Sequence, residues 1–154
     1  MKDITVKTDR LNIIPLEISD LKIMYENEKD NEMKSAYKEM IINMEKHKGF
    51  EEWCTNWEIK LKSGVTVGGL CFKGKPDTKD SVEIGYGIDE DYRNHGYAAE
   101  AVRYISEWAL KQKNVKFVCA QTNKENKISQ KVLIGSGFIR DGYGDEDLLF
   151  KKTL

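Results

Sequence analysis

The stretch EDYRNHGYAAEAV, Glu90–Val102, leads from an alternating apolar segment into a helix that starts near Ala98, and this junction decides the fold. A helix N-terminus leaves about four backbone N–H groups without intrahelical partners. Ser, Thr, Asp or Asn usually satisfies one of them from the cap position. Asn94 could act as such a cap, but Arg93 and Gly96 favour another partner. A glycine-containing turn that enters a helix presents N–H groups and the positive helix end to an anion.

The common phosphate-binding motifs are absent from this junction. The chain contains no G-x-x-x-x-G-K-[ST] sequence, and no G-x-G-x-x-G follows Ile88. What remains is Arg93-x-x-Gly96-x-Ala98, which begins five residues after Ile88, the last apolar residue of the preceding strand. The anion site therefore has to be interpreted from this shorter pattern.

The rest of the chain predicts an α+β domain over residues 1–154, with a mixed, mostly antiparallel sheet and a late strand–helix–strand crossover. Apolar alternation predicts the strands, and spacings of three and four residues predict the helices. The expected strands are 10–16, 56–62, 65–74, 81–89, 115–122 and 148–152. The expected helices are 19–28 with Ser19 as its cap, 31–47, one that starts at Ala98, and a short one within 126–138 that ends at Gly135 or Gly137.

Composition excludes several functional classes. Lys and Arg total 25 and Asp and Glu 26, so no global basic field attracts nucleic acid or an anionic membrane. No apolar run approaches the roughly 20 residues of a membrane span, and the N-terminal residues have no apolar signal-peptide core. Cys54, Cys71 and Cys119 lack C-x-x-C spacing, and His47 and His95 are the only histidines. We therefore expect a reduced, cytoplasmic protein without a metal site.

Three segments together resemble one family. The pattern R/Q-x-x-G-x-G/A between a strand and a helix is similar to the acetyl-CoA signature of the GNAT superfamily of N-acetyltransferases. TDRLNIIPL, VEIGYGIDEDYRNHGYAAEAV and NKENKISQKVLIGSGF resemble, in order, the opening strand, the pyrophosphate loop and the N-x-x-S…G-F segment of the ribosomal-protein N-terminal acetyltransferase (RimJ/RimL-like) branch. The resemblance spans nearly the whole chain.

The resemblance implies a GNAT fold, in which a central strand splays from its parallel neighbour and the pantetheine arm of acetyl-CoA lies in the gap. Asn126 would contact the cofactor and also cap its helix, whereas His95 is better interpreted as a solvated loop residue than as a catalyst. The residues implied to bind acetyl-CoA are Ile88, Asp89, Glu90, Arg93, Asn94, His95, Gly96, Tyr97, Ala98, Asn126 and Ser129.

Acetyl transfer to an amine requires a neutral nucleophile. At pH 7 a lysine-like amine is neutral in about one part in 2,500, roughly 4.6 kcal/mol uphill, so a general base is valuable. Strand alternation places Glu83 on one face with Gly85 and Gly87, so a single carboxylate stands on a face that the two glycines leave open. The family often has its base at this position. The alternative is a solvated surface charge, and a bulge in the strand would undo the alternation.

A proton donor for the leaving thiolate is harder to assign. Many relatives carry Tyr seven residues after the Asn that matches Asn126, and this chain has Leu133 there. Ser129 is the alternative, either as the donor or as a hydrogen-bond partner of the pantetheine. It could equally be an ordinary residue at the start of a helix.

The sequence is therefore interpreted as an N-acetyltransferase in which a primary amine attacks acetyl-CoA directly in a ternary complex. The alternatives are a non-catalytic CoA-binding regulatory module of the same fold and a nucleotide-phosphate domain of another class. The acceptor would be a protein N-terminus, a polyamine or an aminoglycoside-like amine, and a homodimer is left open. Four carboxylates near the C-terminus would favour a multiply charged cation: Asp141, Asp145, Glu146 and Asp147.

Overall fold

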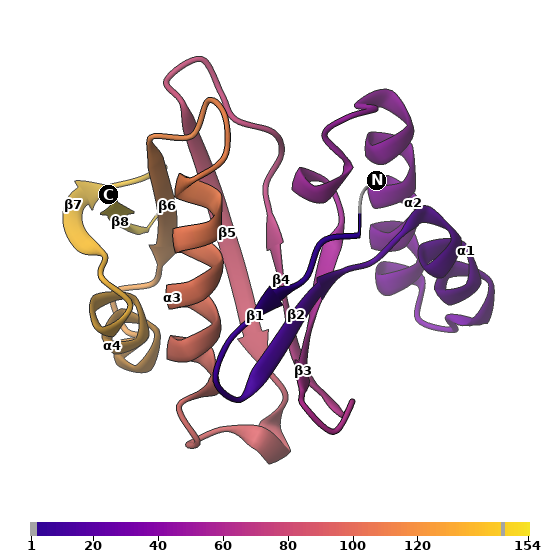
Figure 1. Ribbon diagram of the computed structural model, residues 1–154, viewed down its shortest axis with the longest axis horizontal. Helices are drawn as coiled ribbons and strands as arrows, with labels where there is room; N and C mark the ends of the chain where they lie inside the picture. The colour runs from indigo at the N-terminus through magenta and orange to yellow at the C-terminus, as the bar shows by residue number, and fades with distance from the viewer. Residues whose placement is uncertain (1–2, 146) are drawn as a thin grey trace.

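The computed structural model describes residues 3–145 and 147–154 (Figure 1). Within these residues the chain forms one eight-stranded sheet with the order β1-β2-β3-β4-β5-β6-β8-β7. The strands are β1 (Val6–Lys7), β2 (Leu11–Pro15), β3 (Asn56–Leu61), β4 (Thr66–Phe72), β5 (Ser81–Ile88), β6 (Phe117–Thr122), β7 (Ile139–Tyr143) and β8 (Leu148–Lys152). The helices are α1 (Ile18–Asn27), α2 (Asn31–Lys46), α3 (Tyr97–Leu110) and α4 (Lys127–Gly135), with short 3₁₀ turns η1 (Glu51–Trp53) and η2 (Glu90–Tyr92).

The sheet is antiparallel except between β5 and β6, which α3 connects as a parallel crossover. The predicted α+β class, with its mixed and mostly antiparallel sheet, is confirmed. Strand β5 alternates as predicted: Val82 and Ile84 are buried, and its register against β4 runs without a shift from Gly68↔Ile88 to Phe72↔Ile84. The bulge that would have undone the alternation lies instead in the β3–β4 pair, at Ile59/Lys60.

Helix α3 covers one face of the sheet and forms the main core with it. Its apolar side, at Ala101, Val102, Ile105 and Ala109, is fully buried. An aromatic cluster joins the helix to the sheet, with the Trp108 ring 5.0 Å from Trp57 and 5.3 Å from Trp53 between centroids. Such pairs add roughly 0.5–1.5 kcal/mol beyond simple burial, so this contact fixes the position of α3 against β3 and β4.

Helices α1 and α2 lie on the opposite side of Figure 1 from α4 and β7, with a smaller core of their own. That core is built from Leu16, Leu21, Tyr37 and Met44. A cavity between α1 and the sheet is lined by residues that alternate with the α3-facing ones, including Ile14, Glu58 and Lys60. The two helices therefore face the side of the sheet that α3 leaves uncovered.

Two local predictions were wrong, and one strand was missed. Ser19 lies inside α1, and the cap is Glu17, whose backbone N–H donates to Asp20 Oδ2 at 3.0 Å. Strand β1 was not predicted, because two residues are too few to show alternation. The strand expected from Val115 begins only at Phe117. No helix among the described residues is both long and apolar enough to cross a membrane.

Candidate active site

The central feature is a gap between two parallel strands. Strands β5 and β6 pair at Ser81↔Phe117, Val82↔Val118 and Glu83↔Cys119. After that point β5 continues to Ile88 bonded to β4, while β6 is bonded to β8. Because both strands have outer partners, they diverge without leaving the sheet. The splayed central strand implied by the family resemblance is present.

The loop after β5 ends at a helix that no side chain caps within the described chain. Gly96 is the N-cap of α3, at φ 79°, and Asn94 is also left-handed, at φ 67°. Asn94 is therefore not the cap. The bond from Glu100 N–H to the Gly96 carbonyl, at 3.1 Å, closes the first helical turn. The earlier N–H groups of Tyr97, Ala98 and Ala99 have no intrahelical acceptor, which is the arrangement that suits an anion.

Arg10, from the turn before β2, fastens this loop. Its Nε lies 2.7 Å from Glu100 Oε1, and its Nη1 donates to the His95 carbonyl at 2.8 Å. The guanidinium also lies over the Tyr97 ring, 4.6 Å from its centroid. Burial alone would raise the pKa of Glu100, but hydrogen bonds from Thr8 and Arg10 outweigh it and hold that pKa below its ordinary value. Arg10 thus ties the loop to the first turn of α3.

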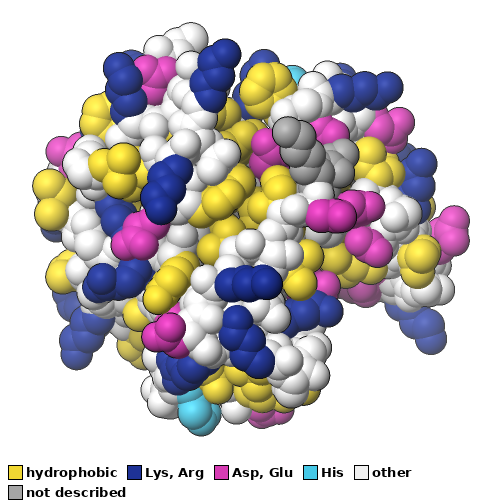
Figure 2. Space-filling view, viewed as in Figure 1, with side chains coloured by type: hydrophobic (Ala, Val, Ile, Leu, Met, Phe, Trp, Pro, Cys, Tyr) yellow, Lys and Arg dark blue, Asp and Glu magenta, His cyan; other side chains and the backbone are white. Residues whose placement is uncertain are grey.

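The loop and α4 enclose a cavity of about 290 Å³. Six of the residues implied by the family resemblance line it, together with Tyr92, Ala99, Ile128 and Val132; the six are Ile88, Arg93, Asn94, Gly96, Tyr97 and Ala98. Figure 2 shows basic side chains gathered on the lower part of this face, where Figure 1 places the β5–α3 connection. The cavity thus combines free backbone donors with positive charge.

Three implied cofactor residues are directed elsewhere. Asp89 gives its N–H to the Val67 carbonyl at 2.8 Å, towards β4, and Glu90 begins η2. His95 has its Nδ1 2.8 Å from the Arg93 carbonyl oxygen, and its ring stacks on Tyr97 at 5.5 Å. These contacts agree with the interpretation of His95 as a loop residue. Asp89, Glu90 and His95 do not line the cavity.

Glu83 stands where the β5–β6 pairing ends, on the face opposite α3. Its Oε1 accepts from Gln121 Nε2 at 3.2 Å, and its Oε2 is ion-paired with Lys73 Nζ at 2.7 Å. The Lys73 contact is too far off line for a regular hydrogen bond to Oε2, so we regard it as a Coulombic pair. The close contact of the Lys73 ammonium with the Glu83 carboxylate, together with the negative charge of that carboxylate, raises the pKa of Lys73 although burial opposes the rise.

The glycines beside Glu83 leave space. A Cβ at Gly87 would meet nothing within 4 Å, and one at Gly85 would make only ordinary contacts at 3.9 Å. The predicted open space beside Glu83 is therefore present on this face of β5. Glu83 opens into a cavity of about 480 Å³, which is also lined by Lys73, Gln121 and Asp145.

The acidic C-terminal segment is only partly directed at this cavity. Asp145 lines it, whereas Asp141 pairs with Lys151 at 3.2 Å on β7 and β8. Glu146 lies outside the described residues. The prediction of a multiply cationic acceptor from four converging carboxylates is therefore not supported at Asp141. Lysines 73, 75 and 79 line the same cavity and offset its negative charge.

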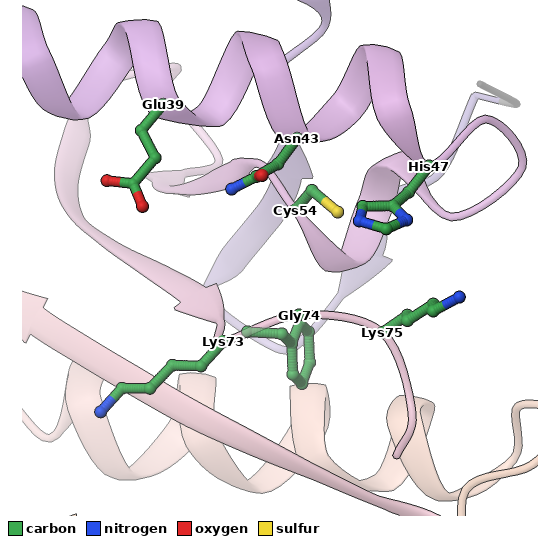
Figure 3. Close-up of a pocket in the computed structure, with 8 residues that line it drawn as sticks. Glu39, Asn43, His47, Cys54, Lys73, Gly74 and Lys75 are labelled. Carbon is green, nitrogen blue, oxygen red and sulfur yellow. The ribbon is translucent and has the colours of Figure 1, made fainter. Parts of the chain in front are cut away.

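Another cavity, of about 490 Å³, adjoins the Glu83 cavity across the Lys73–Gly74–Lys75 segment (Figure 3). Figure 3 shows Glu39, Asn43 and His47 of α2 and the following turn along one wall, with Lys73 and Lys75 directed to opposite sides. Cys54 also lines this cavity, and burial raises the pKa of its thiol. The two cavities form a polar cleft on the α2 side of the sheet.

The first turn of α4 faces the strand gap. Asn126 is the N-cap, and its Oδ1 accepts from the Ser129 N–H at 3.0 Å, as the capping alternative predicted. Ser129 Oγ lies 2.9 Å from the Tyr86 hydroxyl of β5. Leu133 is fully buried, so the position usually occupied by Tyr in relatives belongs to the core here.

Sequence reasoning missed four residues of this site: Arg10, Lys73, Tyr86 and Gln121. The alternation of β5 places Tyr86 on the face opposite Glu83, but nothing in the sequence indicates that its hydroxyl reaches α4. Arg10 stands in the TDR segment that carries part of the family resemblance, which was the available signal. Lys73 and Gln121 come from elements that only the folded sheet brings to Glu83.

Among the described residues, no group of three or more His, Cys, Asp or Glu side chains is arranged to hold a metal ion. Cys54, Cys71 and Cys119 are free thiols. Burial raises the pKa of Cys71, as it does for Cys54, which disfavours the thiolate form needed by a nucleophile.

The family model described as an acetyltransferase (GNAT) domain matches residues 10–139. The chain belongs to the GNAT family of acetyltransferases. Its sequence is 33% identical over 103 residues to the uncharacterized N-acetyltransferase YjdG of Bacillus subtilis, a match that covers 67% of this chain and 60% of YjdG. It is 27% identical over 154 residues to the uncharacterized N-acetyltransferase YnaD of the same organism, covering 97% of this chain and 87% of YnaD.

Solved GNAT structures share the fold. RimL, a ribosomal alpha-N-protein acetyltransferase in complex with coenzyme A, has a TM-score of 0.75 at 13% identity, over 98% of both chains. A chimera of the Vibrio cholerae spermidine N-acetyltransferase SpeG has a TM-score of 0.69 at 13% identity, over 94% and 96%. AAC(6')-Ib in complex with paromomycin and acetyl-CoA has a TM-score of 0.70 at 14% identity, over 94% of both chains. At these identities the likeness concerns the fold alone.

Proposed function

We propose that this GNAT protein transfers the acetyl group of acetyl-CoA to a primary amine by direct attack in a ternary complex. The diphosphate of the cofactor would bind the N–H groups at the start of α3, and the pantetheine would lie in the gap between β5 and β6. One observation carries the proposal: the gap has the helix N-terminus that no side chain caps on one face of the sheet and Glu83, in an open cavity, on the other.

The α3 face supports the cofactor assignment. Gly96 brings the backbone close to the ligand space, and the first turn of α3 offers donors without intrahelical acceptors. The helix end favours a negatively charged ligand. At the start of α4, Ser129 Oγ lies 2.9 Å from the Tyr86 hydroxyl of β5, and Asn126 holds Ser129 through its N–H. Both residues would contact the pantetheine, while Ile88 lines the cavity at the helix end.

Glu83 is the proposed general base. Lys73 Nζ lies 2.7 Å from its carboxylate, which indicates that a primary amine fits beside it. An acceptor ammonium would displace Lys73, whose side chain is 59% exposed and free to move outward. Glu83 would first take a proton from the bound ammonium, which leaves a neutral amine. The amine nitrogen then bonds to the carbonyl carbon, and the second proton that it must lose passes to the departing thiolate or to solvent. The C–S bond then breaks, and its electron pair stays on the sulfur of CoA.

The acceptor would occupy the cleft on the α2 side. A protein N-terminus, as in the ribosomal-protein branch, a polyamine and an aminoglycoside are the candidates, because fold neighbours include a ribosomal-protein, a spermidine and an aminoglycoside enzyme. Both carboxylates and lysines line the cleft, so an acceptor with isolated positive charges suits it better than one with dense positive charge.

A non-catalytic CoA-binding module of the same fold is the second candidate. The burial of Leu133 at the usual Tyr position favours it, as does the engagement of Glu83 by Lys73. Release of free thiol from acetyl-CoA in the presence of peptide N-termini, spermidine or aminoglycosides would decide for the enzyme. CoA binding without turnover across this panel would decide for the module.

The test of the base is Glu83→Gln, which preserves shape but cannot accept a proton. We expect kcat to fall on the order of 10²-fold, with acetyl-CoA affinity unchanged, and the defect to shrink as pH rises towards the pKa of the amine. Glu58→Gln is the matched control, since Glu58 is also a strand carboxylate paired with a lysine, Lys60, at 3.7 Å. A defect in Glu83→Gln that does not vary with pH would exclude the base role.

A further inference from the structure

The hydroxyl groups of Tyr86 on β5 and Ser129 on α4 lie within hydrogen-bond distance of each other and form a hydroxyl pair. Tyr86 lies on the part of β5 that has passed the end of its pairing with β6, on the α3 face of the sheet. Its hydroxyl is 2.9 Å from Ser129 Oγ and 3.4 Å from the Ser129 carbonyl oxygen. The pair joins elements 43 residues apart in the sequence.

We infer that Tyr86 is a positioning residue that donates to Ser129 Oγ and so leaves the serine proton free to bond the departing CoA sulfur. The inference rests on the proposed function. A serine hydroxyl has one proton and two acceptor sites. If Tyr86 supplies a proton to the oxygen, the proton of Ser129 is available to another acceptor. In the gap, that acceptor is the sulfur on which negative charge develops.

The alternation of β5 puts the two ends of the reaction on opposite faces. Glu83 faces the acceptor cleft, and Tyr86, three residues later, faces α3 and α4. Three strand residues span about 10 Å, which leaves room for a thioester between a base on one face and a hydroxyl on the other. The amine approaches the carbonyl carbon from above the carbonyl plane, whereas the C–S bond lies in that plane, so separate positions for the base and for the hydroxyl pair suit the reaction.

The environment of Tyr86 keeps it a donor. Burial raises the pKa of its phenol, and the hydrogen bond to Ser129 only partly offsets that rise. The phenol therefore stays protonated at neutral pH, and a full proton transfer from it to a thiolate would be uphill because a thiol has a reference pKa of about 8.5. Tyr86 thus orients and polarises Ser129, and hydrogen bonding from the serine stabilises the thiolate.

The position of Ser129 strengthens this role. Asn126 caps α4 through the Ser129 N–H, which holds the serine in the first helical turn. A negative charge is favoured near a helix N-terminus. Leu133, one helical turn later, is fully buried, so the position at which many relatives carry Tyr offers no hydroxyl here.

The experiment measures the thiol pKa of CoA bound to the protein, by its thiolate absorbance in the ultraviolet, without any acceptor. In the unaltered protein we expect this pKa to lie about one unit below that of free CoA. Ser129→Ala should restore the free value, and Tyr86→Phe should recover roughly half of the shift. Kinetically, both variants should lower kcat, by about tenfold for Ser129→Ala, with little change in KM for acetyl-CoA.

The controls separate structure from function. Tyr37→Phe removes the hydroxyl of another buried tyrosine, in the α1–α2 core, and should leave the thiol pKa unchanged. The double variant Tyr86→Phe/Ser129→Ala should be no worse than Ser129→Ala, since the two act as a unit. CoA binding with the same thiol pKa in all variants would overturn this inference alone. Failure of the unaltered protein to bind CoA would overturn the proposed function and the inference with it.

Discussion

Arg10 offers the sharpest test of how the cofactor loop is held. It lies outside the cavity, yet it contacts the loop and the helix that follows, through Glu100 and the His95 carbonyl. Replacing it with Gln removes the charge and the forked geometry. Replacing it with Lys retains the charge, but a single ammonium cannot reproduce the planar fork that spans both acceptors.

The magnitude follows from the exposure of each contact. The Arg10 side chain is 46% exposed, so its ion pair with Glu100 contributes about 0.5 kcal/mol. The hydrogen bond to the His95 carbonyl adds about 1 kcal/mol. If this stabilisation of about 1.5 kcal/mol holds the loop in its binding conformation, Arg10→Gln should weaken CoA binding about tenfold.

Titration calorimetry with CoA measures this loss directly, with thermal unfolding recorded on the same samples. Arg10→Lys should lie close to Arg10→Gln, because the fork matters more than the charge. Lys62→Gln is the control: Lys62 bonds Asn12 Oδ1 at 2.9 Å on the same hairpin region and does not contact the loop. An unchanged CoA affinity together with a lower melting temperature would refute the reasoning, since Arg10 would then stabilise only the fold.

Two further predictions concern the helix end and the core. Gly96→Val should abolish measurable CoA binding in calorimetry, because φ 79° is costly for a branched residue and its Cβ would lie 3.4 Å from Arg10 Nη2; Gly64→Val, at φ 97° in open space, should bind CoA normally. Lys152→Met should lower the free energy of unfolding by about 1–2 kcal/mol in urea titrations, since the buried Ser136 carbonyl loses its 2.7 Å donor. Burial lowers the pKa of Lys152 below 10.5, so the unfolded chain binds more protons between the two values and stability rises with pH there. That rise should be absent from Lys152→Met.

The strands and helices with a regular pattern of apolar residues could be predicted, because that pattern is formed by residues close together in the sequence. The two-residue period of β5 was enough to assign Glu83 and its glycines to one face, and that face is the open one. The start of α3 was correct to within one residue. The expectation that this helix end lacks an ordinary side-chain cap agrees with Gly96 as the N-cap, although the sequence does not reveal that Asn94 and Gly96 are both left-handed.

The contacts that bring the site residues together could not be predicted from the sequence. Arg10 meets Glu100 from 90 positions away, and no periodicity reports such a separation. The acidic segment near the C-terminus shows that residues close together in the sequence can also have different surroundings in the fold. Asp141 and Asp145 lie in the same short segment of sequence, but one pairs with Lys151 across β7 and β8 while the other lines the cavity beside Glu83.

The short pairing between β5 and β6 also has a consequence for how the chain folds. Strands β1 to β5 bond among themselves, and so do β6 to β8, so only the rungs from Ser81 to Glu83 join two otherwise self-contained halves of the sheet. Joining them requires the long parallel crossover through α3, which is slower to form than a hairpin. We expect each half to assemble first and the seam to close last. The gap for the cofactor is then the part of that seam that closure leaves open.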